Sequence, residues 1–181
     1  MVKTTARTTI TKPLNHRQVK RLVDQASYDA SKLWNCGRYQ LFEWLDNNNL
    51  PSEESFDSAL KRELKDNKHY NGLHSQSAQQ VLEELSDAFQ SWFDLRHKDD
   101  RAKPPGYRKD GDCRPRSTVT FKEDGFKHDP DNDRVRLSKG SNLKDHFSDF
   151  LLCEYQTRPD VDLSEVERVQ TVRAVWNGQQ W

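Results

Sequence analysis

The feature that most constrains this chain is a stripe of apolar residues, spaced three and four positions apart, that continues for nearly thirty residues. Residues at this spacing lie on one face of an α-helix. The pattern therefore predicts one long helix that begins after Asn15 and ends at Asn47-Asn48-Asn49 and Pro51. The stripe consists of Val19, Leu22, Val23, Ala26, Ala30, Leu33, Trp34, Gly37, Leu41, Phe42 and Leu45.

Two shorter amphipathic segments follow the long one, and all three need a surface against which to bury their apolar stripes. Ser52, followed by two acids, begins the second segment, whose apolar positions are Phe56, Ala59, Leu60 and Leu64. The third runs from Ser75 or Ser77 to about Arg96, with Ala78, Val81, Leu82, Leu85, Ala88, Phe89, Trp92 and Phe93 on one side. We predict a small helical bundle over residues 16–98, with a loop at 67–73.

The two ends of the chain have the composition of β-strands. The pattern predicts a first strand in Lys3–Thr11, a turn at 123–125, and later strands in 117–122, 134–137, 150–155 and 166–176. The expected fold class is α+β, with a bundle of about three helices inserted into one small antiparallel sheet or barrel. Phe89, Trp92 and Phe93 are expected in the core, and Trp44, off the main stripe, is expected to be the most exposed of Trp34, Phe42 and Trp44.

Basic residues are concentrated in two short segments, although the whole chain has no net charge. Residues 1–21 carry a local charge of +6, residues 101–116 carry +4, and the remainder carries −10. The second segment also contains prolines that hold it extended, and Tyr107, which can stack on a base or a sugar. This segregation is the pattern of a phosphate-binding surface, and the alternative is a pair of solvated charge runs.

Other kinds of site are poorly supported by the sequence. Cys36, Cys113 and Cys153 are too far apart for a CxxC pair, which argues against a disulfide framework or a zinc site. We expect Cys36 to be buried, the histidines to take surface or capping roles, and the acids at 129–133 to form a solvated turn rather than a calcium loop. We predict no cofactor and no metal. No apolar run is long enough for a membrane span or a signal peptide, so we expect a soluble, cytoplasmic protein.

The order of segments resembles the amino-terminal half of TnpB-type (OrfB) transposon nucleases, which are relatives of type V CRISPR effectors. An opening basic strand and a long helix precede SQSAQQVLEELSDAFQSWFDL at 75–95, KPPGYRK at 103–109 and STVTF at 117–121. The resemblance covers nearly the whole chain. Its most specific part is the helix at 75–95 coupled to the basic segment at 103–109.

This resemblance implies a fold, a division of the chain and a partner. The first strand (1–14) and the basic linker with the later strands (101–181) would form a wedge domain of the oligonucleotide-binding-like barrel type. Residues 15–100 would form a helical recognition lobe, and together these parts would bind guide RNA, an RNA–DNA duplex or DNA. The residues expected to contact nucleic acid are Lys3, Arg7, Lys12, Arg101, Lys103, Tyr107, Arg108, Lys109, Arg114 and Arg116.

The resemblance also implies that this chain is not an enzyme by itself. The nuclease domain of the family, with its Asp-Glu-Asp carboxylates and zinc ribbon, would begin where this sequence stops at Trp181. The leading interpretation is therefore a nucleic-acid-binding, transposition-related protein without a nuclease domain. The alternatives are an interaction subunit that docks on a separately encoded nuclease half through its strand-rich tail, an active endonuclease, and an inactive remnant.

Overall fold

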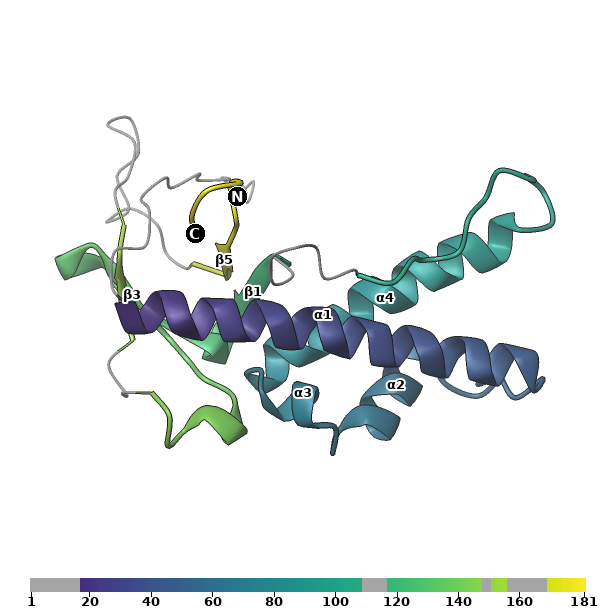
Figure 1. The fold of residues 1–181 in the computed structure, drawn as a ribbon, viewed down its shortest axis with the longest axis horizontal. Helices are drawn as coiled ribbons and strands as arrows, with labels where there is room; N and C mark the ends of the chain where they lie inside the picture. Colours follow the sequence, from purple (N-terminus) through teal and green to yellow (C-terminus); the bar gives the residue numbers. More distant parts are fainter. Residues whose placement is uncertain (1–16, 109–116, 148–150, 156–168) are drawn as a thin grey trace, which may run out of the picture.

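A long helix, α1 (Arg17–Asp46), extends along one side of the molecule, and the other elements pack against it (Figure 1). The computed structural model describes residues 17–108, 117–147, 151–155 and 169–181. The predicted first strand lies outside these residues. Helix α1 confirms the prediction from the apolar stripe, and it ends where Asn48 adopts the left-handed conformation, with φ 55°.

Three further helices complete the helical part of the chain. Helix α2 (Phe56–Leu64) and helix α4 (Ser75–Leu95) are the two shorter amphipathic helices that the sequence predicts. The predicted loop at 67–73 instead contains a one-turn helix, α3 (Lys68–Asn71), because the side chain of Asn67 accepts a hydrogen bond from the backbone of His69 and caps it. As expected, Phe89 is fully buried, while Trp92 and Phe93 are partly buried against the core.

Helix α1 packs tightly against α4 at Gly37. A Cβ atom at this position would lie 2.7 Å from Leu85 Cδ2 and 3.2 Å from Leu82 Cδ2. Gly37 therefore allows the two helices to bring their apolar stripes together without a gap. Phe42 and Phe56 both meet Phe89 edge-on, at 5.6 and 5.2 Å between ring centroids, and join α1 and α2 to α4. Trp44, expected to be the most exposed of Trp34, Phe42 and Trp44, is half-buried against the same core, as Phe42 is.

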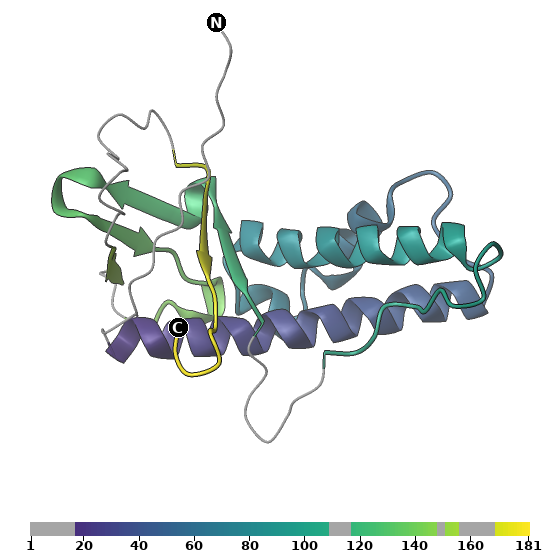
Figure 2. The same ribbon diagram turned by 90° about the horizontal axis from the view of Figure 1, so that it is seen from above.

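The described strands form two small antiparallel sheets rather than the single sheet that the sequence predicts. Strand β1 (Val119–Lys122) pairs with β5 (Thr171–Ala174). The other sheet has the order β2 (Phe126–Asp129), β3 (Arg134–Leu137), β4 (Leu152–Glu154), as Figure 2 shows. Strand β2 was not predicted, because only one of its four residues, Phe126, is strongly apolar.

The helices and the sheets share one hydrophobic core. Val119 and Phe121 of β1 are almost fully buried and belong to the same apolar cluster as Leu82 and Leu85 of α4. The fold class is therefore α+β, as predicted. Within the described residues, no helix has both the length and the apolar character that crossing a membrane requires.

The helical and strand parts are also joined at a point where two backbones nearly touch. A Cβ atom on Gly140 would lie 2.5 Å from the carbonyl carbon of Gly72 and 2.6 Å from the carbonyl oxygen of Asn71. The adjacent 3-10 turn, Ser141–Leu143, contacts α3 through Asn142, whose amide donates to the carbonyl oxygen of Lys68 at 3.4 Å. Because the obstacle at Gly140 is backbone, it cannot move aside as a side chain can.

We predict that Gly140→Ala lowers the free energy of unfolding by about 1–3 kcal/mol, since the added methyl group forces two backbones apart. Urea denaturation followed by circular dichroism measures this change. Gly106→Ala is the matched control, because no heavy atom lies within 4 Å of its Cβ position. Equal midpoints for the two variants would show that this contact is not tight in solution.

His74 connects α4 to the strands and has an unusual environment. It is the N-cap residue of α4 and is half-buried beside Gly125, and its Nδ1 has no hydrogen-bond partner. Burial lowers the pKa of His74, and the charge of Asp124 acts in the opposite direction with a smaller effect. The folded protein therefore binds a proton at this site less readily than the unfolded chain does.

We predict that part of the stability is lost as the pH falls below about 6.5, the ordinary pKa of histidine, toward the lowered pKa of folded His74. His74→Gln removes this contribution, so its free energy of unfolding should change less than that of the wild type between pH 7.5 and 5. His146→Gln, at an exposed position, should behave as the wild type does. Parallel curves for the wild type and His74→Gln would contradict the prediction.

Candidate nucleic-acid interface

The linker at residues 101–108 returns from the end of α4 along the side of α1 (Figure 2). A reciprocal pair of hydrogen bonds holds its far end. The amide of Asn35 donates to the carbonyl oxygen of Arg108 at 2.9 Å, and the backbone N–H of Arg108 donates to Asn35 Oδ1 at 2.8 Å. One side chain of α1 thus satisfies both backbone groups of a linker residue.

Two neighbouring side chains of α1 hold the preceding residues of the linker. The indole N–H of Trp34 donates to the carbonyl oxygen of Gly106 at 2.9 Å, and Arg38 Nε donates to the carbonyl oxygen of Pro105 at 2.6 Å. Three carbonyl groups of the linker, at residues 105, 106 and 108, therefore accept hydrogen bonds from α1. The prolines predict an extended linker, and these contacts fix its position.

Arg38 is the best-placed cation of this interface. Its guanidinium carbon lies 4.0 Å from the ring centroid of Tyr107 and 4.4 Å from that of Phe42. Within the described part of the chain, its polar contact is the Pro105 carbonyl, and no carboxylate forms an ion pair with it. A cation–aromatic contact orients a guanidinium without neutralising its charge, so the edge of Arg38 keeps donors for an incoming anion.

Tyr107 itself is 49% exposed, and next to it Tyr39 of α1 is 56% exposed. The Tyr39 hydroxyl is hydrogen-bonded to Glu43, which raises the pKa of Tyr39, with a smaller contribution from the nearby Tyr107 hydroxyl. Tyr39 therefore remains neutral at physiological pH. Tyr39 and Tyr107 both offer aromatic surface to solvent.

Arg108 occupies a different environment from that of an exposed cation. Its guanidinium carbon lies 3.9 Å from the ring centroid of Trp34, and its Nη2 forms an ion pair with Glu84 of α4 at 3.5 Å. Burial lowers the pKa of Arg108, an effect that Glu84 partly offsets. Its charge is thus shared with α4, and a contact from Arg108 to a phosphate remains a prediction.

The remaining predicted contact residues fall into two groups. Arg101 and Lys103 are exposed, and Arg101 forms an ion pair with Asp99 at 3.3 Å. Arg101 and Lys103 therefore share one linker with Tyr107 and Arg108. The others lie outside the described residues: Lys3, Arg7, Lys12, Lys109, Arg114 and Arg116.

Sequence reasoning did not identify the residues of α1 that hold the linker. Trp34 was assigned to the core, and its ring is indeed buried, but its indole nitrogen binds the linker. Asn35 and Arg38 were not singled out. Their place beside the apolar stripe was the one hint that α1 holds another segment, and this hint is weak when the segment that packs there is unknown.

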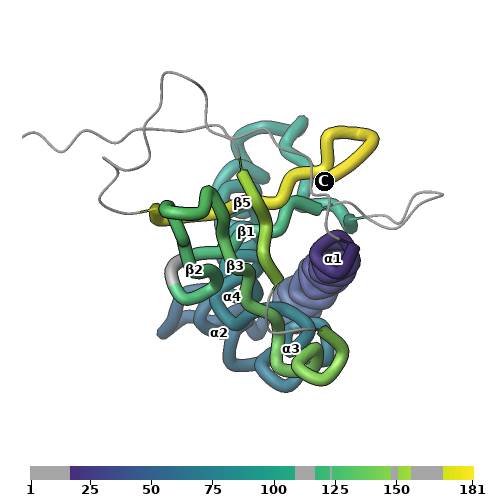
Figure 3. Tube along the Cα trace, turned by 90° about the vertical axis from the view of Figure 1, so that its left-hand side faces the viewer, coloured from purple at the N-terminus to yellow at the C-terminus, as the bar shows by residue number. Residues whose placement is uncertain are grey.

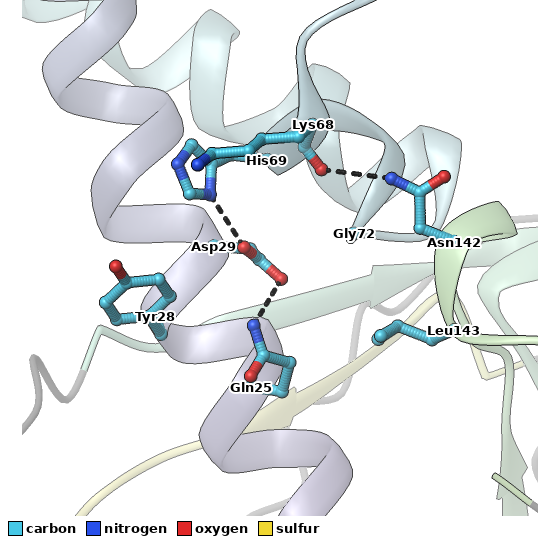
Figure 4. A pocket seen from close by; sticks show the side chains of 8 residues that line it. All are labelled: Gln25, Tyr28, Asp29, Lys68, His69, Gly72, Asn142 and Leu143. Atoms are coloured by element: carbon cyan, nitrogen blue, oxygen red, sulfur yellow. Dashed lines mark hydrogen bonds and ion pairs between the residues drawn. The ribbon is translucent and has the colours of Figure 1, made fainter. Parts of the chain in front are cut away.

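A pocket of about 270 Å³ lies where α1, α3 and the turn at 141–143 meet (Figure 4). Its floor is Asp29, which is 5% exposed and accepts hydrogen bonds from Gln25 at 3.0 Å and from His69 Nδ1 at 2.8 Å. Both carboxylate oxygens therefore have partners inside the protein. A Cβ on Gly72 would collide with Asp29, so this cluster ties α3 to α1 and does not form an open reactive centre.

Several smaller expectations can be compared with the structure. His69, expected at the surface or at a cap, is largely buried beside Asp29, and His74 stands at the N-cap position of α4 without a capping hydrogen bond from its side chain. Cys36, expected to be buried, is partly exposed. Across the described ranges, His, Cys, Asp and Glu side chains form no group of three that could hold a metal ion.

The strand-rich tail does not expose both of its tryptophans. Trp181 is 8% exposed, and its indole N–H donates to Asp24 of α1 at 2.9 Å. Trp176 meets it edge-on, at 5.5 Å between ring centroids. The alternative of docking on a nuclease half assumed that this tail exposes apolar surface, but Trp181 packs against α1 instead.

No protein-family model matches this sequence, and a search of the curated proteins finds no similar one. The chemistry of the interface must therefore be argued from its own residues.

We predict that Asn35→Ala releases the end of the linker, because each of the two lost hydrogen bonds contributes about 1 kcal/mol. Limited trypsin digestion should then cut after Arg108 roughly tenfold faster, as expected for a local opening that has become easier. Gln40→Ala, one turn further along α1, should leave the rate unchanged. An unchanged rate for Asn35→Ala would show that the linker is held by other contacts.

Proposed function

We propose that this chain binds RNA or DNA along the linker side of α1, as the wedge and recognition region of a TnpB-type protein would. The observation that carries the proposal is the position of Arg38, held between two aromatic rings and bonded to the linker backbone, with no carboxylate partner among the described residues. A fixed, unneutralised guanidinium beside an exposed tyrosine suits a phosphate next to a base or a sugar.

The surroundings of Arg38 support the same proposal. Lys103 is exposed on the linker, and Tyr107 covers one face of Arg38 while its own outer face is open to solvent. Because the linker is held by α1, these groups lose little conformational freedom on binding. Contacts of this kind would bind the backbone and the unpaired bases of nucleic acid rather than a particular sequence.

We predict that Lys103→Gln and Tyr107→Leu each weaken nucleic-acid binding. Losing one phosphate contact should reduce the slope of log K against log salt by about 0.7–0.9, whereas Tyr107→Leu should lower affinity with little change in slope. Fluorescence anisotropy with labelled RNA, DNA and an RNA–DNA duplex measures both effects. Lys65→Gln on α2 is the matched control.

A folded wild-type chain that binds none of these probes at low salt would rule out the proposal. A Lys65→Gln effect equal to that of Lys103→Gln would show that binding follows total charge and not the linker.

A further inference from the structure

The outward side of α1 carries basic and aromatic side chains that the linker site does not use. They are Arg17, Arg21, Tyr28, Lys32 and Tyr39, at alternating steps of four and seven residues, and we call them the outer strip. Such steps keep residues on one side of a helix. Figure 3, which looks along α1, shows α2, α3 and α4 together on one side of it.

Cations of the outer strip contact aromatic rings. Arg21 lies 5.9 Å from the ring centroid of Phe147, and Lys32 lies 5.3 Å from that of Tyr28. Neither Arg17 nor Arg21 forms an ion pair with a carboxylate of the described residues, and both are exposed. The aromatic contact of Arg21 holds its side chain in place and leaves its charge available.

Three cations of α2 and β1 are neutralised instead. Lys61 of α2 forms ion pairs with Asp57 at 2.9 Å and Glu83 at 2.8 Å, and Arg62 pairs with Glu54. Lys122 of β1 also pairs with Glu83, at 3.5 Å. The difference lies in the arrangement of charges and not in the number of basic residues.

Few acids lie on the part of α1 that carries the outer strip. Before Glu43, α1 contains only two carboxylates, Asp24 and Asp29. Asp24 accepts the indole N–H of Trp181, and Asp29 is buried with Gln25 and His69. A polyanion lying along the strip would therefore meet little repulsion until it reached Glu43.

We infer that the outer strip of α1 is a track for single-stranded nucleic acid, with phosphates on Arg17 and Arg21, one base against the edge of Tyr28 and another stacked on Tyr39. Cations interleaved with aromatic side chains are characteristic of surfaces that bind single strands, because every base has a face that can stack. Arg17 to Tyr39 spans about 33 Å at a rise of about 1.5 Å per residue. That length matches about ten nucleotides of a stacked strand, at about 3.4 Å each.

The track rests on the proposed function and extends it. Tyr39, at one end of the strip, lies close enough to Tyr107 for their hydroxyl groups to interact electrostatically. A strand that follows α1 would thus arrive at the linker site, where Arg38 and Tyr107 would meet its next nucleotide. The occupant is a single strand rather than a duplex, since exposed tyrosines can stack only on bases that are unpaired.

The test compares two double variants of the full chain that lose the same charge. Arg17→Gln/Arg21→Gln removes two cations from the strip, and Arg62→Gln/Lys65→Gln removes two exposed cations from α2. The probes are a labelled twelve-nucleotide oligo(U), the matching oligo(dT) and a blunt duplex of similar length, measured by fluorescence anisotropy at several salt concentrations. Circular dichroism confirms that every variant is folded.

For the single strands, the strip variant should reduce the slope of log K against log salt by about 1.4, at about 0.7 for each lost phosphate contact, and the α2 variant should leave it unchanged. Tyr39→Leu should lower single-strand affinity about tenfold and leave duplex affinity unchanged. Comparable losses of affinity for oligo(U) and oligo(dT) would show that the track does not recognise the 2′-hydroxyl. A loss for only one of them would show whether the track binds RNA or DNA.

Three results would each overturn the track. The two double variants could have equal effects, or the strip variant could lose as much duplex binding as single-strand binding. Polyglutamate could also displace the strand as readily as unlabelled oligonucleotide does. If the strip variants bind as the wild type does while Lys103→Gln and Tyr107→Leu bind weakly, the track is wrong and the linker site stands. If no probe binds to the folded wild type, both proposals fail together.

Discussion

The packing of α1 against α4 is the contact on which the rest of the structure depends. Both helices are amphipathic, and burying the two stripes against each other removes most of the apolar surface of the helical part from water. Gly37 permits the close approach of Leu82 and Leu85 that makes this contact tight. With one side of α1 committed to α4, its remaining surface is left for the linker and for the outer strip.

Long, periodic elements were the part of the fold that the sequence could predict. Helices α1 and α4 repeat their apolar spacing over many turns, so chance patterns are unlikely to imitate them. The strands are three or four residues long, and β2, with the sequence FKHD, carries almost no alternation. The pairing of β1 with β5 depends on contacts between distant parts of the chain, which a local pattern does not contain. The oligonucleotide-binding-like barrel remains a prediction.

The clustering of basic residues predicted one part of the candidate site, the linker. Clustered basic residues identified the linker, but Asn35 and Arg38, which position it, belong to a helix whose own pattern gives no hint of a bound segment. The charge of a residue also does not show whether it is available to a phosphate, because Arg108 forms an ion pair with Glu84 whereas Arg38 forms none with the described residues. What distinguishes these cations is their neighbours in the folded chain, and these follow from tertiary packing.

The hydrogen bonds between Asn35 and Arg108 resemble one rung of a β-ladder in which a helix side chain takes the place of the second strand. A rung of this kind fixes register as well as position. Deleting one residue between Lys103 and Gly106 would shift the carbonyl groups at 105 and 106 out of register with Arg38 and Trp34. Natural variation in the length of this connector should therefore be confined to the stretch before Lys103, which lies ahead of the residues that α1 holds by hydrogen bonds.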